Sequence, residues 1–564
     1  MCTNFTNFFN AKIAQFKSAI AADLNQCISP HISDLPCTSS HLFNITPVTS
    51  AEVFKLLSSL PSKTSVLDFV PTSIIKSCSS VFSEAISHLA NLSFSEGCFP
   101  TSFKHASVTP LLKKSNLDPN LPSNYRPISN LNNISKILEK LFLARLIPHI
   151  SSSSNFNPHQ SAYRQYHSTE TALLHLVDSI YHAADNGCAT LLLGLDLSAA
   201  FDTIDHSILL NRLHTSFGIS GPTLNWVSSY LNKRSFTVRS QSSTSPSLPI
   251  PCGVPQGSVL GPILFSLYTS PIAGIATSHG VSQQQYADDT QLFISITPNT
   301  LNTNLNQLNS CLISLRGWFL QNGLALNPDK TEAICFGTAG RKKSLSDLTS
   351  INVSGSQISL SDNIKLLGVT LDSSLNFDRH TSNICSSSYF HIRALRRIRP
   401  FLDLATAKSI GAAIVGSRLD YANSVLNGVP QRNIQRLQRV QNTLARVVAD
   451  DSVTPSRQLL SSLHWLPINQ RIQFKILTTV YRSLNGTAPQ YLHSLLTDYA
   501  PSRSLRSSNL NLLTAPNIRT KIGSRGFRSS GPVMWNSLPA SFRTYNTYPA
   551  FRSKLKTHLF CDGP

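Results

Sequence analysis

The sequence is poor in charge, and above all in acid. Only 13% of its 564 residues are charged, and 28 Asp and Glu stand against 48 Lys and Arg, which gives a net charge of +20 at pH 7. This balance favours a polyanion such as nucleic acid as partner, although a merely soluble basic protein would also show it. The chain is 41% hydrophobic, which excludes a disordered chain, and its length predicts about two to four domains.

Cysteine clusters and long apolar runs are also lacking. The 11 cysteines include no CxxC pair and no Cys/His cluster, which argues against a zinc site or a disulfide framework and predicts a reduced, intracellular protein, nuclear or cytoplasmic. No run reaches the roughly 18 apolar residues of a membrane span, and the N-terminus lacks the pattern of a secretory signal. The apolar residues of that N-terminus instead recur at helical spacing and predict an amphipathic helix: Phe5, Phe8, Phe9, Ile13, Phe16 and Ile20.

The residue composition and the expected secondary structure change along the chain. Residues 1–93 predict helices separated by Ser/Pro-rich turns, and residues 94–372 predict short strands alternating with helices. Beyond 380 the chain turns helical and basic, with apolar and Arg positions interleaved over 391–402 and 431–448. The tail from about 505 to 564 is weakly patterned.

Within the central region, the order of elements predicts an α+β sheet. An apolar run, TLLLGLDL at 190–197, has strand length and follows an amphipathic helix at 171–184. An acidic hairpin in QQYADDTQLF (284–293), a long helix over 301–319 and two strands around the Asn-Pro turn of 324–336 come next. This is the order of a ferredoxin-like sheet.

Three aspartates stand out in this sheet. Asp196 ends the first strand, and Asp288 and Asp289 lie side by side in the hairpin. A lone acid at a strand end is usually a helix cap or a solvated residue. If the strand and the hairpin are neighbours, however, the three carboxylates converge, and such a cluster suits two Mg²⁺ ions, with Mn²⁺ as the alternative. Paired cations of this kind catalyse in-line phosphoryl transfer, which is polymerase chemistry.

Several segments resemble the motifs of reverse transcriptases, and they follow one another along the chain in the order of those motifs. YADD at 286–289 resembles their metal-binding hairpin, DLSAAF at 196–201 their first catalytic aspartate motif, and QGSVLGPILF at 256–265 the motif beneath template and incoming nucleotide. A YxDD alone would be weak, whereas the ordered set is strong. The resemblance is closest to LINE-type (non-LTR) retrotransposons and extends to further segments: YRPISNL, QSAYRQYHST, IKLLGVTLD, SRLDYANSVLNGVP, LQRVQNTLARVV and LHWLPINQRIQFKIL.

The resemblance implies a right-hand polymerase. Its fingers and ferredoxin-like palm together form the reverse transcriptase domain at 94–372, divided near residue 186, and a helical thumb follows at 380–450. A helical extension at 1–93 and a basic region of unknown role at 451–564 flank it. The implied reaction is RNA-directed addition of deoxynucleotides to a primer 3′-hydroxyl in target-primed retrotransposition. The implied partners are an RNA template, a DNA primer, their RNA–DNA hybrid and dNTPs.

Further residues take roles from the same resemblance. Phe201 occupies the place of an aromatic ring that excludes a 2′-hydroxyl and so favours DNA synthesis, with core packing as the alternative. Gln256 and Gly257 lie where the backbone approaches the nucleotide and template. Lys113 and Arg126 fall in the fingers, where Arg126 could hold phosphate oxygens bidentately, while Lys113 could equally be a solvated strand end.

Lys330, in the turn NPDKTE, corresponds to a lysine proposed to protonate the leaving pyrophosphate, although a surface ion pair would explain it equally well. Arginines of the predicted thumb would contact the phosphate backbone of the hybrid duplex: Arg393, Arg396, Arg397, Arg399, Arg436 and Arg439.

The first 93 residues are too few for the endonuclease that usually precedes such a polymerase. A target nick is therefore expected to come from an endonuclease acting in trans, or the chain is a truncated copy. Two other readings stay open. One is a catalytically inactive, retrotransposon-derived protein that binds nucleic acid, and the other is a relative of group II intron maturases. The LINE-like C-terminal segments count against the latter.

Overall fold

The computed structural model describes residues 2–26, 35–198, 201–240, 243–353, 355–500 and 511–561, so Ala199 and Ala200 of DLSAAF lie outside the described residues. The chain forms two compact units. Unit 1 comprises residues 1–160, 196–279 and 310–327, and unit 2 comprises residues 161–195, 280–309 and 328–564.

Unit 1 contains a sheet with the strand order β2-β1-β5-β6, and β7 also pairs with β5. Its strands are β1 (His105–Leu112), β2 (Tyr125–Asn130), β5 (Arg234–Ser240), β6 (Ser243–Thr244) and β7 (Leu248–Ile250), with the short pair β4 (Leu197–Ser198) and β10 (Ala325–Leu326). Its helices are α1 (Cys2–Gln26), α2 (Ser50–Ser58), α3 (Thr72–Ser77), α4 (Ser79–Ser95), α5 (Asn133–Ser152), α7 (His206–Thr215), α8 (Gly221–Leu231), α9 (Gly261–Tyr268) and α10 (Pro271–Ser278).

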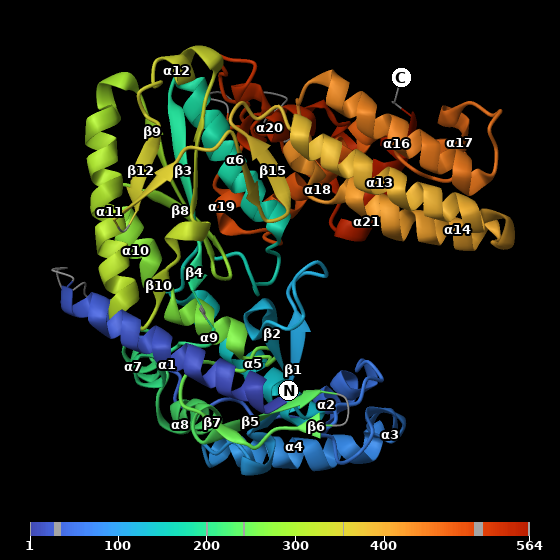
Figure 1. Cartoon of the computed structure of the whole chain (residues 1–564). Helices are drawn as coiled ribbons and strands as arrows, with labels where there is room; N and C mark the ends of the chain where they lie inside the picture. Colours follow the sequence, from blue (N-terminus) through green and yellow to red (C-terminus); the bar gives the residue numbers. More distant parts are fainter. Residues whose placement is uncertain are drawn as a thin grey trace. The chain divides into compact units, whose positions relative to one another are not determined.

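The helix predicted at the N-terminus is α1, and its apolar face packs on the sheet of unit 1 (Figure 1). Phe5 and Phe9 are buried against Val108 of β1 and Val238 of β5. The Phe5 ring also meets the Tyr125 ring edge-on, with centroids 4.9 Å apart. Burial of these rings, rather than helix propensity, holds α1 in place.

Unit 2 contains an antiparallel sheet of order β11-β3-β9-β8. Its strands are β3 (Ala189–Leu195), β8 (Ser282–Tyr286), β9 (Asp289–Ile296) and β11 (Glu332–Phe336). In chain order the spatial sequence is fourth, first, third, second. The predicted neighbourhood of the first strand and the acidic hairpin is thereby confirmed, together with the ferredoxin-like order.

The helices predicted around this sheet are also present. α6 (Thr169–Asp185) begins at a capping box made by Ser168 and Thr171, and its apolar face packs on β3 and β8 (Figure 1). α11 (Leu301–Gln321) is the long helix expected from the leucine spacing.

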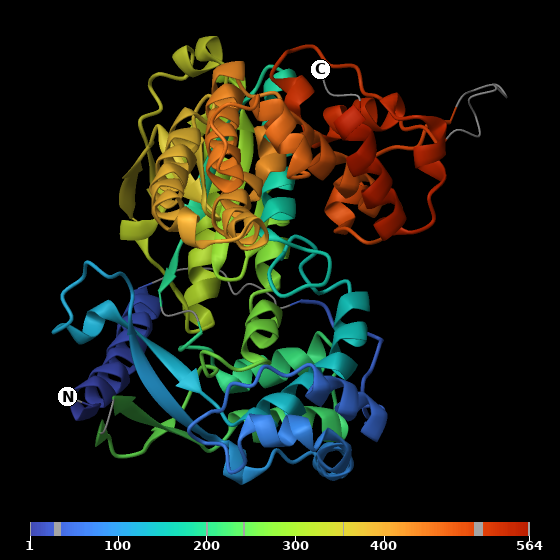
Figure 2. The ribbon, with the colours of Figure 1, turned by 90° about the vertical axis from the view of Figure 1, so that its right-hand side faces the viewer.

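The rest of unit 2 consists of two small hairpins and a group of helices that Figure 2 shows in yellow, orange and red. The hairpins are β12 (Ser350–Val353) with β13 (Ser356–Ser359), and β14 (Asn363–Leu366) with β15 (Val369–Asp372). The helices are α12 (Ala339–Lys343), α13 (Asp378–Ile398), α14 (Leu404–Gly411), the π-helix η6 (Ala412–Gly416), α15 (Ser417–Asp420), α16 (Gln431–Ala449), α17 (Ser456–Ser462), α18 (Ile468–Leu484), α19 (Gln490–His493), α20 (Phe527–Ser537) and α21 (Tyr548–Cys561).

The weakly patterned tail forms helices in its described residues, and α20 and α21 pack on α18. The Tyr481 and Phe551 rings stack with centroids 4.3 Å apart. Trp465 and Trp535 are both buried in the same hydrophobic core. Pro532 lies inside α20 and hides the helical pattern from sequence, so tertiary packing decides this segment.

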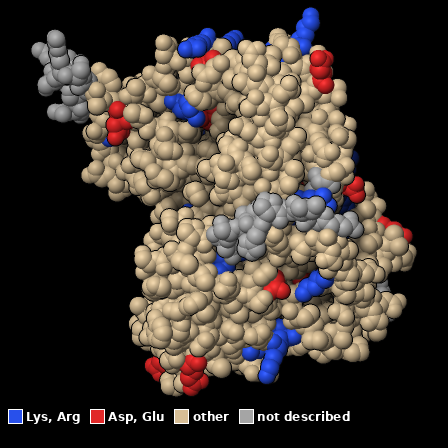
Figure 3. Space-filling view, turned by 90° about the vertical axis from the view of Figure 1, so that its left-hand side faces the viewer, with Lys and Arg blue, Asp and Glu red and all other residues tan. Residues whose placement is uncertain are grey.

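The surface carries its charges sparsely. On the face in Figure 3, Lys and Arg side chains form small, separate groups between wide uncharged areas, as a charged content of 13% implies. Within the described ranges, no helix combines the length and the apolar character that crossing a membrane requires.

Candidate active site

The paired aspartates lie at the tip of the β8–β9 hairpin. Tyr286 pairs with Asp289, so Ala287 and Asp288 form the two-residue turn between the strands. Ala287 has a φ of 59°, in the left-handed region that costs a non-glycine residue about 1 kcal/mol. The side chain of Asp288 is half-buried and that of Asp289 is exposed. Left-handed backbone in a tight turn is the geometry that right-twisted hairpins select.

Asp196 follows the strand that pairs with this hairpin. Leu195, the last residue of β3, is opposite Thr290 of β9, and Asp196 begins the segment of unit 1 that follows this strand. The backbone oxygen of Asp196 accepts a hydrogen bond of 2.9 Å from Asn327. Among the described residues, no group of three or more His, Cys, Asp or Glu side chains is arranged to hold a metal ion. The convergence of the three carboxylates stays a prediction.

A buried polar network joins the QSAYRQYHST segment to β8. Ser161 donates its backbone N–H to the Gln285 oxygen at 2.9 Å, and its hydroxyl accepts from the Gln284 amide at 2.9 Å. His175 of α6 contacts the other end of the Gln284 amide at 2.9 Å. Burial lowers the pKa of His175 to about 4, so the ring is neutral at physiological pH. Hydrogen bonds among buried polar groups fix β8, and therefore the position of its turn.

Phe201 lies against the segment that contains Gln256. Its ring stacks on that of buried Phe265, with centroids 4.5 Å apart, and its backbone oxygen accepts from the Val254 N–H at 2.9 Å. The adjacent Asp202 accepts a 2.8 Å hydrogen bond from the Gln256 side chain. Two sequence motifs separated by about fifty residues therefore form one structure in unit 1.

Gly257 is required by its surroundings. Its φ is +117°, and an added Cβ would lie 2.6 Å from the backbone oxygen of Ser129 in β2. The preceding residue fixes the same contact, because the Ser129 N–H donates to the Gln256 oxygen at 2.8 Å. The glycine therefore lets the Gln-Gly segment lie directly against β2.

Glu139 of α5 supports the same segment and was not identified from sequence. Its carboxylate is fully buried and accepts hydrogen bonds from the Val259 and Leu260 N–H groups at 2.7 and 3.0 Å, just before α9. The Tyr230 hydroxyl donates to it at 3.1 Å. Burial raises the pKa of Glu139, and the hydrogen bond from the Leu260 N–H opposes that shift. A glutamate within an apolar helix offers no sequence signal for this role.

A small cavity of about 100 Å³ opens beside these residues. Gln256, Asp202 and Ser129 line it, together with Phe9 and Lys12 of α1. Burial raises the pKa of Asp202, whereas the Gln256 hydrogen bond and the charge of Lys12 lower it. The N-terminal helix thus contributes a wall to this cavity, which its amphipathic pattern alone did not reveal.

The predicted cations are exposed. Lys113 and Arg126 are at the end of the β1–β2 hairpin where the loop joins the strands, and Arg126 pairs with Leu111. The Lys113 ammonium donates to the Ser123 oxygen at 2.7 Å, which fits a strand-end role as well as phosphate binding. Lys330 is exposed in the short turn Pro328–Lys330 that precedes β11.

Comparison with known proteins agrees with this arrangement. Residues 111–371 match the family described as reverse transcriptase (RNA-dependent DNA polymerase). The chain is 29% identical to a Drosophila melanogaster protein named "Probable RNA-directed DNA polymerase from transposon BS", over 79% of this chain and 48% of that protein. It is 27% identical to the RNA-directed DNA polymerase from mobile element jockey of the same species, over 72% of this chain and 44% of that protein.

Among solved structures, an apo telomerase from Candida tropicalis, truncated from its C-terminal domain, is 13% identical to the chain. The match covers 53% of this chain and 60% of that one, with a TM-score of 0.35.

Residues 111–371 are therefore similar to reverse transcriptases. The chain as a whole is similar to RNA-directed DNA polymerases of a transposon and a mobile element, and it spans about half the length of these curated relatives.

Proposed function

We propose that the chain is an RNA-directed DNA polymerase that adds deoxynucleotides to a primer 3′-hydroxyl. The observation that carries this proposal is the YADD hairpin, whose adjacent carboxylates sit at the end of a strand paired with β3. The match over 111–371 supports it. The proposed partners are an RNA template, a DNA primer, their hybrid and dNTPs, in target-primed integration. The fingers, palm and thumb are proposed at the boundaries expected from the sequence.

Asp196, Asp288 and Asp289 are the proposed ligands of Mg²⁺, with Mn²⁺ as the alternative. Carboxylate oxygens are the donors that hard divalent cations prefer. Two adjacent aspartates in a turn also repel each other unless positive charge compensates them. Bound Mg²⁺ would activate the primer hydroxyl and neutralise charge on the triphosphate.

The other proposed residues hold the template and the nucleotide or donate a proton. Gln256 and Gly257 would hold the template and the nucleotide, because the contact with Ser129 fixes their backbone. Arg126 and Lys113 would grip the triphosphate from the exposed end of their hairpin. Lys330 is the proposed proton donor to pyrophosphate.

Primer extension tests the activity directly. Purified chain with an oligo(dT)-primed poly(A) RNA, dTTP and Mg²⁺ should extend the primer. Excess EDTA should abolish the extension, because it removes the cation that the proposed carboxylates hold. Gel electrophoresis of a labelled primer measures the product. If Mg²⁺ or Mn²⁺ supports no extension on RNA by folded protein, the proposal is wrong.

Replacing Phe201 tests the choice of sugar. We expect Phe201→Val to raise ribonucleotide incorporation relative to deoxynucleotide incorporation by about tenfold, because the smaller side chain leaves room for a 2′-hydroxyl. Competitive extension with rNTPs and dNTPs measures the ratio. Phe265→Leu, which alters the stacking partner alone, is the control. An unchanged ratio in a folded Phe201→Val protein would leave core packing as the role of this ring.

A further inference from the structure

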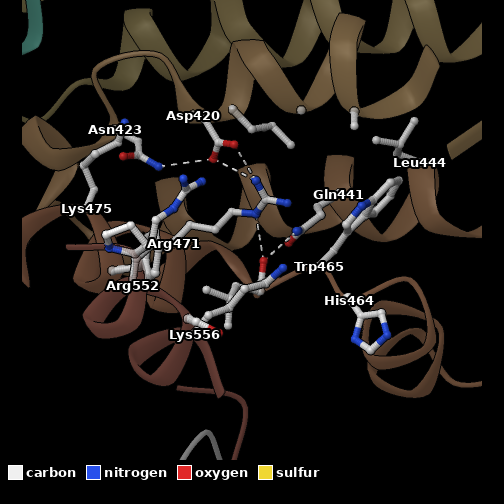
Figure 4. Close-up of a pocket in the computed structure, with 17 residues that line it drawn as sticks. Asp420, Asn423, Gln441, Leu444, His464, Trp465, Arg471, Lys475, Arg552 and Lys556 are labelled. Atoms are coloured by element: carbon white, nitrogen blue, oxygen red, sulfur yellow. Dashed lines mark hydrogen bonds and ion pairs between the residues drawn. The ribbon is translucent and has the colours of Figure 1, made fainter. Parts of the chain in front are cut away.

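One cavity lies outside the region that matches reverse transcriptases, entirely within unit 2. It has a volume of about 620 Å³, within the roughly 300–1,000 Å³ typical of ligand pockets. Its walls come from η6, α15, α16, α18 and α21 (Figure 4). The η6 wall is π-helical between Ala412 and Gly416, a form that is rare and frequent at functional sites.

Positive charge dominates this cavity. Four cations line it against a single lining acid, Asp420, among the described residues, and the cations are Arg471, Lys475, Arg552 and Lys556. Figure 4 shows Arg471 near the centre of the view, with Lys475 and Arg552 on one side of it and Trp465 and His464 on the other. The lining thus carries an excess of three positive charges.

Internal partners fix part of this charge. Arg471 binds both oxygens of Asp420 at 2.7 Å and donates to the Leu466 backbone oxygen at 2.8 Å. Lys475 pairs with Glu170 at 3.1 Å. These contacts hold the floor of the cavity in a single arrangement, as a preformed binding site requires.

Arg552 and Lys556 differ from Arg471 and Lys475 in being exposed. They lie one turn apart on α21. The Lys556 ammonium lies 5.9 Å from the Phe560 ring centroid. Desolvation lowers the pKa of Lys556, and the charges of Arg471, Lys408 and Arg552 lower it further. Cations crowded in this way repel one another, and a bound anion would relieve the repulsion.

The size of the cavity limits the ligand. About 620 Å³ accommodates one phosphate-bearing nucleotide, whereas a duplex, whose major groove alone is about 12 Å wide, cannot enter it. Exposed His464 supplies an aromatic ring next to the cations, and the edge of the largely buried Trp465 also lines the cavity. Aromatic rings beside cations are the combination by which proteins hold single-stranded nucleic acid.

We propose that this cavity binds a phosphate of single-stranded RNA through Arg552 and Lys556, with Lys475 and Arg471 behind them. The choice of RNA rests on the proposed function, in which the chain handles an RNA template. The cavity would hold a single-stranded part of that RNA, outside the RNA–DNA hybrid that forms during synthesis. Such a contact would keep the chain on its own transcript during synthesis.

Binding of a fluorescein-labelled octauridylate to the full chain, followed by anisotropy in EDTA, tests this proposal without requiring catalysis. For the double variant Arg552→Gln, Lys556→Gln we expect Kd to rise by roughly tenfold at 100 mM salt. The slope of log K against log salt should fall in magnitude by about 0.7, since one phosphate contact on a single strand contributes about that much. Inorganic phosphate should compete with the oligonucleotide in the wild type and much less in the variant.

The matched control is Lys521→Gln, Lys554→Gln, which removes the same charge from exposed positions that do not line the cavity. It should change Kd by less than twofold. Equal losses in the two double variants, or no loss in either, would overturn the proposal. Preferential binding to vesicles containing phosphoinositides, lost through Arg552 and Lys556 while octauridylate binding is kept, would overturn the assignment to RNA. Because none of these measurements uses dNTPs, their outcome is independent of primer extension.

Discussion

Replacing Asp288 by asparagine is expected to lower the rate of nucleotide addition by about a thousandfold or more, without lowering stability. Removing one preorganised electrostatic contact to a transition state typically costs 10²–10³ in rate, and a ligand of the proposed cations should cost at least as much. Asp288 lies in the β8–β9 turn next to Asp289. Since the two carboxylates repel each other without a cation, the free energy of unfolding measured in EDTA should stay constant or rise.

Asp347→Asn provides the control for charge, because Asp347 is an exposed aspartate of the same unit. It should leave both the extension rate and the melting temperature close to the wild-type values. Single-turnover extension on primed RNA, together with thermal unfolding, measures the two quantities. Extension by Asp288→Asn at more than a tenth of the wild-type rate would contradict the role of Asp288 as a metal ligand.

Replacing Glu139 by alanine is expected to lower the free energy of unfolding by about 4 kcal/mol. Each buried donor left without a partner costs about 1–3 kcal/mol, and the deleted side chain adds a cavity. The Val259 and Leu260 N–H groups both lose their acceptor in this variant. Because these residues follow Gln256 and Gly257 closely, extension should also weaken. Urea unfolding and primer extension measure the two effects.

Glu139→Gln separates hydrogen bonding from charge. The amide oxygen can still accept from the two backbone N–H groups, and its NH₂ group can donate to the Ser135 hydroxyl, which now donates to the carboxylate. This variant should therefore lose far less stability than the alanine variant. Comparable losses in the two variants would show that the hydrogen bonds to Val259 and Leu260 do not determine stability here.

The difference in unfolding free energy between the wild type and Glu139→Gln should depend on pH. Burial raises the pKa of Glu139 in the folded state, so the folded state binds this proton more tightly than the unfolded state does. The free energy of unfolding of the wild type should then rise, relative to that of Glu139→Gln, as pH falls through the raised pKa. Urea unfolding at several pH values measures this difference. A difference that does not change with pH would contradict a raised pKa of Glu139 in the folded state.

Local patterns were sufficient to predict the sheet of unit 2 and the helices α6 and α11. Residues close together in the sequence are enough to recognise the apolar run of β3, the acidic hairpin and the leucine spacing of α11. The antiparallel pairing of β3 with β9 followed from the order of the elements. A reverse transcriptase domain could be inferred for the same reason, since its motifs are short and occur in a fixed order.

Residues whose role depends on distant partners could not be predicted. Glu139 meets Leu260 across 121 positions, and Asp202 meets Gln256 across 54. The C-terminal helices α20 and α21 were missed because their stability comes from docking on α18. No local pattern encodes which acid will be buried beside which backbone N–H group.

The sequence by itself determined the reverse transcriptase motifs, the basic charge of the chain and the period of each central strand and helix, because these properties depend on residue type and short spacing. Only the tertiary structure decided that Glu139 anchors the start of α9, that α1 lines the cavity beside Gln256, and that four cations from α18 and α21 surround one cavity. The physical reason is burial. Packing brings groups that are distant in the chain out of water together, and their hydrogen bonds and charges then depend on that environment.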